Sequence, residues 1–386
     1  MFSLSAVNFI YQFFVVAMYI FLPLYLRHKD FSVTQIGLLM AISPMISIAA
    51  QPIWGFVSDK YQTIKKVIIL LLFIGLIFVT GLFFFNQIVQ IAILMLFMYF
   101  FITPIPSFLE SLSVDYAMHH NINYGNIRLW TSIGFGIASI VLGRVTNIIG
   151  IDKLIYLMLL FGGISLLVIF QLNDKTSQVK ATTIDHELLI KTFKNKEILT
   201  FLLIVFLISF PLRLADSIFS LFITALGGTE NHVGIAWAII AISEVPMMLL
   251  IGRMLKKYDH LQLICFGGFV YAIRWLLYSI FPNVQLILVF QLLQPFSFVL
   301  FFVSGLQYMS KIVPKELMAT GQMLYFAIYT GVSGILGNTL GGFLMDQISG
   351  QFVYQLAAVI TLLGTIYAYS VYKVKKTKTC LQDIKN

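Results

Sequence analysis

Apolar stretches long enough to cross a lipid bilayer recur along the whole chain. About 20 apolar residues suffice for a membrane-spanning helix, and the 386 residues hold twelve such stretches. They lie at roughly 4–26, 33–57, 66–85, 88–114, 127–149, 154–172, 198–222, 233–252, 261–280, 284–309, 318–341 and 352–372. Hydrophobic residues make up 59% of the chain and charged residues 11%, whereas about 25% of a soluble domain is charged. These features exclude a soluble enzyme and predict an all-α membrane protein with twelve transmembrane helices.

One long polar segment separates the first six stretches from the last six. Residues 173–197 mix lysines with acidic residues, while most other connections are short. This pattern predicts two six-helix bundles joined by a linker. We expect an N-terminal bundle over 1–172, a cytoplasmic linker over 173–197, a C-terminal bundle over 198–373 and a cytoplasmic tail over 374–386.

The positions of lysine and arginine predict the orientation in the membrane, because loops rich in basic residues face the cytoplasm. With both termini inside, only Arg27, Lys29 and Lys153 lie in outer loops, and the other loop and tail lysines and arginines are cytoplasmic. The net charge of +9 then reflects topology and attraction to anionic lipid headgroups, and no nucleic acid is needed to explain it. We expect a monomeric, multi-pass protein of the cell membrane with both termini cytoplasmic.

Two loops, 55–66 and 252–259, repeat one pattern. Each begins with a glycine at a helix end and continues with basic residues and a tyrosine, and Gly55 and Gly252 are 197 positions apart. The repeat favours a duplicated six-helix unit. The alternative is that both loops simply carry the basic residues expected of cytoplasmic loops.

The first of these loops resembles a signature of the major facilitator superfamily. Its pattern there is Gly-x-x-x-Asp-[Arg/Lys]-x-Gly-[Arg/Lys]-[Arg/Lys], and the matching residues here are Gly55, Asp59, Lys60, Lys65 and Lys66. The second glycine is missing and one or two residues are inserted. The resemblance implies the fold of that superfamily, two pseudo-symmetric six-helix bundles, and a gating role for these five residues in switching between inward-open and outward-open states.

Ionisable residues inside the apolar stretches are few and lie in both halves. Each costs at least about 2.5 kcal/mol near the bilayer centre, so such residues tend to be functional. Their distribution predicts a polar central cavity with paired charges. The alternative for each is an ion pair that only fixes helix packing. The residues concerned are Glu110, Asp115, Arg128, Arg213, Asp216, Glu244 and Arg274.

The segment 124–134 carries a second resemblance. Its sequence Tyr-Gly-Asn-Ile-Arg-Leu-Trp-Thr-Ser-Ile-Gly resembles the Tyr-Gly-x-x-Arg-Leu-Trp-Gly-Ser-x-Gly motif of lactose permease-like and phenylpropionate permease-like proton symporters. In the lactose permease-like group, a glutamate 18 residues before the motif's arginine binds the sugar together with that arginine. Glu110 and Arg128 have the same separation, so the resemblance implies that both bind substrate.

The same resemblance implies proton coupling, by Glu244 and Arg274 and less directly by Asp216. The family's histidine and glutamate on helix 10 are absent here, and all six histidines lie in loops or near helix ends. A proton would therefore have to be carried by a carboxylate whose pKa is raised by burial, with Glu244 as first choice and Asp216 or Glu110 as second. Gln294, on helix 10, is a candidate for hydrogen bonding to substrate.

The first helix carries a polar stripe. Asn8, Tyr11 and Gln12 lie at i, i+3 and i+4 and share one helical face. The stripe suits a hydroxyl-rich substrate such as a sugar, and an interhelical hydrogen-bond seam is the alternative. Trp237 is a candidate for stacking against a sugar ring.

Transport is the function that these features favour. The sequence lacks His-Glu-x-x-His, Gly-x-Ser-x-Gly, Gly-x-Gly-x-x-Gly and Walker motifs, so no enzyme is predicted. Its two cysteines exclude a disulfide scaffold or a multi-cysteine metal site, and we expect no metal and no cofactor other than a coupling proton. We predict alternating-access uptake of a small polar solute, a sugar or oligosaccharide in preference to an aromatic or other organic acid or a nucleoside. A drug–proton antiporter is disfavoured because the fifth helix lacks proline.

Overall fold

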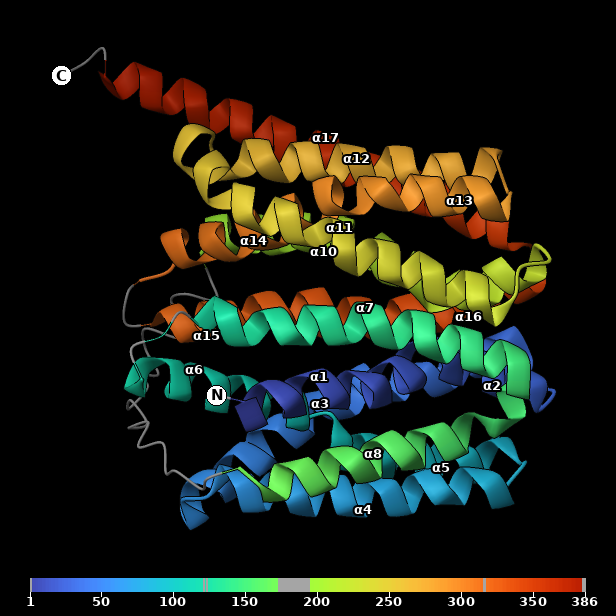
Figure 1. Ribbon diagram of the computed structural model, residues 1–386. Coiled ribbons are helices and arrows are strands. Elements are labelled where there is room, and N and C mark those ends of the chain that lie inside the picture. The colour runs from blue at the N-terminus through green and yellow to red at the C-terminus, as the bar shows by residue number, and fades with distance from the viewer. Residues whose placement is uncertain (1, 121, 123, 173–194, 315–316, 384–386) are drawn as a thin grey trace. The chain divides into compact units, whose positions relative to one another are not determined.

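The computed structural model describes residues 2–120, 122, 124–172, 195–314 and 317–383, and these residues form helices and no strand (Figure 1). Twelve helical spans in these ranges are long and apolar enough to cross a membrane, which confirms the predicted fold class. The spans are Ser3–His28, Val33–Tyr61, Ile64–Phe84, Ile88–His119, Tyr124–Ile149, Ile151–Phe170, Lys196–Ala225, Glu230–Lys257, His260–Ile280, Val284–Ile312, Thr320–Gln347 and Gly350–Thr377.

Several spans contain more than one helical element. Before residue 173 the elements are α1 (Phe2–Val16), the π-helical turn η1 (Ala17–Phe21), α2 (Leu22–His28), α3 (Val33–Tyr61), α4 (Ile64–Phe84), α5 (Ile88–Ile102), α6 (Ile105–His119), α7 (Tyr124–Ile149), η2 (Ile151–Lys153) and α8 (Leu154–Phe170). After residue 194 they are α10 (Lys196–Ala225), α11 (Glu230–Lys257), α12 (His260–Ile280), α13 (Val284–Phe290), η3 (Gln291–Leu293), α14 (Gln294–Ile312), α15 (Met318–Phe326), the π-helical η5 (Ala327–Val332), α16 (Ser333–Gln347) and α17 (Gly350–Asp383).

The chain folds into two compact units. The first comprises Met1–Ala181, Ser217–Ile242 and Asn338–Asp346, and the second comprises Thr182–Asp216, Ser243–Gly337 and Gln347–Asn386. Helices α10, α11 and α16 therefore contribute to both units. The predicted bundle boundaries stay predictions, and most of the predicted linker, 173–194, lies outside the described residues.

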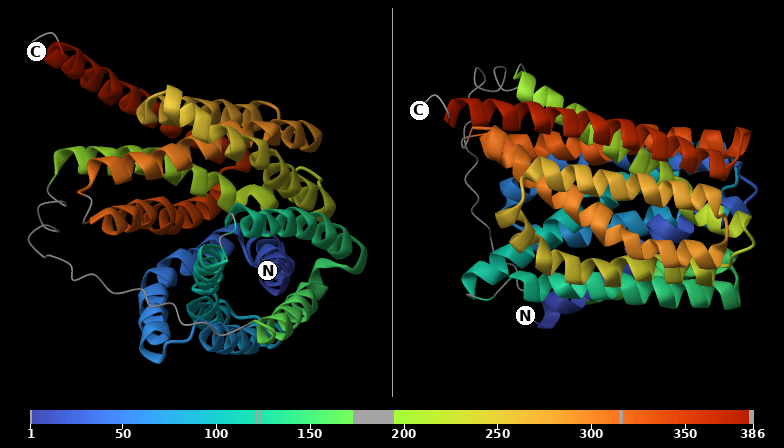
Figure 2. Two further views of the ribbon diagram at one scale, coloured as in Figure 1. Left: turned by 60° about the vertical axis from the view of Figure 1, so that its left-hand side comes forward. Right: turned by 90° about the horizontal axis from the view of Figure 1, so that it is seen from above.

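In the first unit, α1 packs against α7 and α8, and α4 packs against α5 and α8 (Figures 1 and 2). Backbone contact between α1 and α7 depends on Gly134, because a Cβ there would lie 2.6 Å from the carbonyl oxygen of Phe9. Real Cβ atoms do not approach other atoms so closely, so only glycine fits. The last glycine of the 124–134 motif thus brings the polar residues of α1 next to α7.

Two further glycine pairs join helices within the first unit. Gly37 in α3 meets Gly342 in α16, and Gly234 in α11 meets Gly143 in α7, with a Cβ at each glycine falling about 3 Å from the partner's Cα. Gly37 and Gly234 are 197 positions apart, the separation of Gly55 and Gly252 in the repeated loops. The duplication therefore extends from the loops into the helix contacts.

A carboxylate lies beside the first of these two contacts. The Asp346 carboxylate accepts a hydrogen bond from the Thr34 hydroxyl at 2.7 Å, at the first turn of α3. Asn338 donates to the Met40 carbonyl oxygen at 3.2 Å. At the positions equivalent to Thr34 and Asp346, the second contact has Asn231 and Asn147.

In the second unit, α12 is the central helix and packs against α14 and α17. Its buried side chains include Tyr271, Arg274, Trp275 and Tyr278. Helix α17 runs on to Asp383, so residues 374–383, predicted as part of a tail, are helical. There Lys375 bonds Glu197 at the start of α10 and donates to the Tyr308 hydroxyl at 2.5 Å.

Candidate substrate and coupling sites

Glu110 and Arg128 form an ion pair in the first unit. A break at Thr103 and Pro104 ends α5 and starts α6, which carries Glu110. Arg128, on the first turns of α7, donates from Nη1 to Glu110 Oε2 at 3.3 Å. The side chains of Arg128 and Glu110 are 53% and 43% exposed. Because exposed ion pairs contribute only about 0–1 kcal/mol to stability, this pair can exchange its partner for a ligand at small cost.

A third residue, which the sequence reasoning did not single out as a site residue, completes this group. The Tyr124 hydroxyl donates to Glu110 Oε1, the oxygen that Arg128 does not bind. Tyr124 opens the sequence motif, and its i, i+4 spacing from Arg128 was the signal that could have revealed it.

Asn8, in α1, is buried close to Glu110, Arg128 and Tyr124, where α1 contacts α6 and α7. Its amide donates to the Ser113 hydroxyl on α6 at 3.1 Å, and its side-chain oxygen accepts from Thr131 on α7 at 3.3 Å. The amide also donates to the Leu4 carbonyl oxygen at 2.9 Å. Asn8 therefore links α1, α6 and α7, which is the geometry of an interhelical hydrogen-bond seam.

The other predicted residues of α1 differ in environment. Tyr11 is 1% exposed and stacks on Phe14 with ring centroids 5.9 Å apart, and its hydroxyl has no hydrogen-bond partner among the described residues. Gln12 is half-buried. The stripe therefore contains buried and half-buried positions, and its substrate role stays a prediction.

Trp237, in α11, lies among aromatic rings of the first unit. It meets Phe219 and Phe135 edge to face, with ring centroids 5.7 and 6.3 Å away. The indole Nε1 is buried, and no described residue accepts a hydrogen bond from it. This donor and the ring are features that a sugar-binding tryptophan would use, and the sugar-stacking role of Trp237 stays a prediction.

The second unit holds a buried guanidinium enclosed by aromatic rings. Arg274 is 2% exposed. Its Cζ lies 4.0 Å from the Trp275 ring centroid, 5.3 Å from that of Tyr271 and 5.8 Å from that of Tyr278. Nε and Nη1 have no hydrogen-bond partner among the described residues. Cation–π attraction to these rings therefore compensates in part for burial of this charge.

Two carboxylates belong to the same region of the second unit. Asp216, in α10, lies within electrostatic reach of both Arg213 and Arg274. Glu244, in α11, is near enough to Tyr271 and Tyr329 to act on both rings electrostatically. The structure thus gathers the three residues predicted to couple protons, Asp216, Glu244 and Arg274, around one group of tyrosines.

Arg213 occupies an aromatic site of its own in the second unit. Its guanidinium lies 4.7 Å from the ring centroid of Tyr329, and its Nε donates to the Tyr329 carbonyl oxygen at 3.4 Å. Asp216 interacts electrostatically with both Arg213 and Arg274. The region can therefore hold the two positive charges of the arginines near one or two negative charges of carboxylates. Such balance permits a carboxylate to change its charge without leaving an isolated ion.

Two glutamines at the break between α13 and α14, within the tenth span, differ in their hydrogen bonds. Gln291 accepts a hydrogen bond from the Tyr278 hydroxyl at 2.6 Å. Gln294 is 6% exposed, and its Oε1 has no partner among the described residues. Gln294 therefore retains an acceptor, as a substrate-binding residue in the second unit would.

The predicted gating residues surround the loop between α3 and α4. A Cβ at Gly55 would meet nothing within 4 Å, so no close approach requires this glycine here. Among the described residues the Asp59 carboxylate forms no salt bridge, while Lys65 donates to the Phe170 carbonyl oxygen at 2.8 Å. Gln62, where the superfamily pattern has its second glycine, adopts the left-handed conformation (φ 48°).

Lys60 and Lys66 complete the predicted gating set, and both are exposed. The Lys60 ammonium lies 5.7 Å from the ring centroid of Tyr61. The Lys66 backbone N–H bonds the Thr63 hydroxyl, which caps α4. These contacts fix the local shape of the loop, and its role in gating stays a prediction.

The sequence matches the model of the MFS_1 like family over residues 1–356. The chain belongs to this family of the major facilitator superfamily. The family assignment confirms the resemblance seen in the loop 55–66 and in the motif 124–134. It identifies a multi-pass membrane transporter of a small-molecule substrate, and not an enzyme. Within the described residues no group of three or more His, Cys, Asp or Glu could hold a metal ion.

Relatives and solved structures agree with this assignment. An uncharacterized transporter of Bacillus subtilis, YwbF, is 32% identical over 94% of this chain and 91% of its own. A maltose permease of Geobacillus stearothermophilus is 26% identical over 94% of this chain and 92% of its own. The crystal structure of the nucleoside transporter NupG matches with a TM-score of 0.83 at 18% identity, covering 96% of this chain and 98% of that one. The last likeness establishes the fold alone.

Proposed function

We propose that this transporter is a proton-coupled symporter that takes up a small polar solute by alternating access, with sugars or oligosaccharides as the preferred class. The observation that carries the proposal is the exposed Glu110–Arg128 pair. A carboxylate and a guanidinium side by side present acceptors and donors to neighbouring hydroxyl groups, and charged partners make the stronger hydrogen bonds. The similarity to a maltose permease supports the same class.

The proton site in this proposal is Glu244, aided by Arg274 and Asp216. Glu244 is the first choice because it lies near Tyr271 and Tyr329, in the same region as Asp216 and Arg274. Protonation of Glu244 would accompany solute loading, and its deprotonation would follow release. Gln294 and Trp237 are the further candidates for solute contact, and the loop with Gly55, Asp59, Lys60, Lys65 and Lys66 is the candidate gate.

An organic acid is the second candidate cargo. The unpartnered donors of Arg274 favour it, because a buried guanidinium is a strong partner for a carboxylate. A nucleoside is a third possibility within the same transport class.

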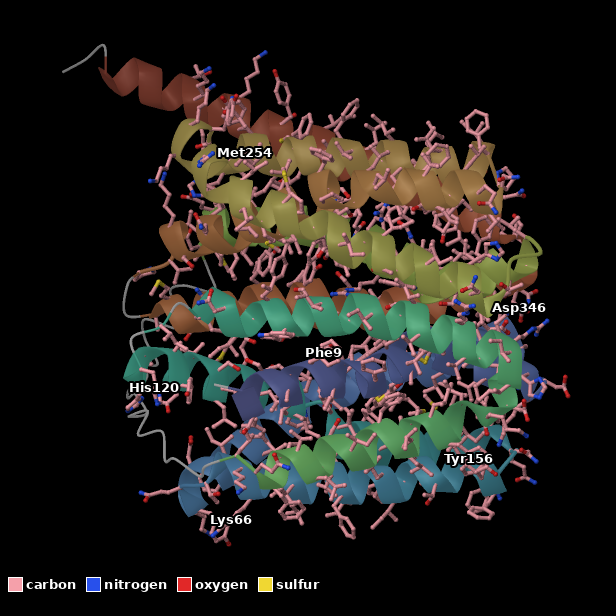
Figure 3. The ribbon with its side chains drawn as sticks, in the orientation of Figure 1. Phe9, Lys66, His120, Tyr156, Met254 and Asp346 are labelled. Carbon is pink, nitrogen blue, oxygen red and sulfur yellow. The ribbon has the colours of Figure 1, made fainter. Side chains whose placement is uncertain are left out.

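We also propose a monomer in the cell membrane with both termini cytoplasmic. In the first unit, Lys66 and His120, both expected inside, lie at one end of the helices, and Tyr156 lies at the other (Figure 3). Membrane-impermeant labelling of single cysteines introduced at Lys66 and Tyr156 in intact cells tests the orientation. Labelling at Tyr156 alone supports it, and labelling at Lys66 alone reverses it.

The test of function is external pH in lightly buffered suspensions of de-energised proteoliposomes. Disaccharides, monosaccharides, aromatic acids and nucleosides are added one at a time. We expect alkalinisation outside with one disaccharide class, and none in liposomes without protein. Radiolabelled uptake of that solute without proton movement would contradict symport, and alkalinisation with an aromatic acid alone would replace the sugar assignment.

A further inference from the structure

Two hydrogen-bond donors on one face of α7 hold the two oxygens of Glu110. Tyr124 and Arg128 are four residues apart, so their side chains lie one helical turn from each other. The Tyr124 hydroxyl bonds Oε1, and Arg128 Nη1 bonds Oε2 at 3.3 Å. Each oxygen of the carboxylate therefore has its own donor.

A second, buried set of hydrogen bonds keeps α6 and α7 in place for this arrangement. Ser113 follows Glu110 by three residues and Thr131 follows Arg128 by three, and the Asn8 side chain bonds both. The Ser113 hydroxyl in turn donates to the Leu109 carbonyl oxygen at 2.7 Å. The two helices are thus joined at successive turns, once through the exposed carboxylate and once through the buried amide.

We propose that Tyr124 is a positioning residue for solute binding: its hydroxyl fixes the Glu110 carboxylate so that Oε2 faces Arg128. This inference rests on the proposed function, in which Glu110 and Arg128 contact the solute. The last torsion of a glutamate side chain is broad, and an exposed glutamate samples several rotamers. A hydroxyl on a rigid aromatic ring removes that freedom before the solute arrives, so less order has to be created on binding.

The kinetic test compares Tyr124→Phe with Tyr156→Phe. The first substitution keeps the ring and removes the hydroxyl that bonds Glu110, and the second removes a hydroxyl from an exposed tyrosine of α8, at the other end of the unit. For the solute that wild type transports, we expect Tyr124→Phe to raise KM about tenfold, with the maximal rate changed less than about twofold. Tyr156→Phe should leave both parameters at wild-type values. An unchanged KM in Tyr124→Phe would overturn the proposal.

A double-mutant cycle with Glu110→Gln separates positioning from a general structural effect. If Tyr124 acts through Glu110, Tyr124→Phe should raise KM less than about twofold when Glu110 is already glutamine. Equal effects in both backgrounds would show that Tyr124 acts independently of Glu110 and would overturn the proposal.

An infrared measurement tests the contact itself without any transport. The difference between spectra of purified wild type and Glu110→Gln isolates the carboxylate band of Glu110. We expect Tyr124→Phe to shift this band, because one oxygen loses its donor, and Tyr156→Phe to leave it in place. An unshifted band overturns the positioning role. If wild type moves no solute while the band shifts, the proposed function fails and the positioning contact stands.

Discussion

The two units place their central arginines in opposite environments. In the first unit Arg128 is 53% exposed and bonds a carboxylate that is itself 43% exposed. In the second unit Arg274 is 2% exposed and lies over the ring of Trp275, with two donor atoms unpartnered among the described residues. An exposed ion pair is weak and exchanges readily, whereas a buried charge is costly unless its surroundings compensate for it. The comparison suggests a division of labour, with solute binding at the first site and charge changes at the second.

The largest expected effect is on uptake and stability when each of the two arginines is replaced by lysine. Arg274→Lys loses the planar guanidinium that stacks on Trp275, so we expect uptake to fall about 100-fold and the melting temperature to fall by several degrees. Arg128→Lys should raise KM about tenfold without changing the melting temperature, because the pair it belongs to is exposed. Uptake assays and thermal unfolding in detergent measure both. The exposed Arg144 is the matched control, and equal losses of stability at Arg274 and Arg128 would refute the contrast.

Replacing Glu110 by glutamine tests whether the exposed pair of the first unit acts in solute binding and not in stability. Glu110→Gln removes the charge that Arg128 bonds, and we expect KM to rise by about 10- to 100-fold through loss of charge-assisted hydrogen bonds to the solute. The melting temperature should change by less than about 2 °C, since the pair is exposed. Asp152→Asn is the control, because Asp152 also forms an exposed pair, with Lys153. A wild-type KM in Glu110→Gln would remove this pair from solute binding.

The smallest expected effect concerns the buried amide behind the exposed pair. Asn8→Ala leaves Ser113 and Thr131 without their shared partner, and we expect a loss of about 1–2 kcal/mol in unfolding free energy. KM should rise only about two- to threefold, because Glu110 and Arg128 keep their own contact. Unchanged stability, measured by thermal unfolding, would show that this seam does not hold α6 and α7 together.

The number of helices could be predicted because the bilayer sets a minimum length of apolar chain for each span. Helix ends were less predictable, because a helix continues into water once its backbone hydrogen bonds are formed. The fourth apolar stretch ends near residue 114, yet the helical span runs to His119. The last stretch ends near 372, yet α17 continues to Asp383. Hydropathy marks the thickness of the membrane and not the end of the helix.

The candidate site was less predictable than the fold. The spacing of Glu110 and Arg128 pointed to a pair, and the structure joins them; their role in binding stays a prediction. The spacing of Tyr124 and the polar stripe of the first helix were visible in the sequence. The partners of the Tyr124 hydroxyl and of the Asn8 amide could not be assigned from it, because they depend on how α1, α6 and α7 are rotated about their axes.

The most direct test of the division of labour is solute movement by Glu244→Gln in proteoliposomes, measured with and without an imposed pH gradient. The carboxylate Glu230, at the start of the same helix, provides the control variant Glu230→Gln. We predict that Glu244→Gln still exchanges labelled for unlabelled solute across the membrane but no longer accumulates solute when the outside is made acidic, whereas Glu230→Gln does both. Accumulation by Glu244→Gln at the wild-type level would show that the second site does not carry the proton.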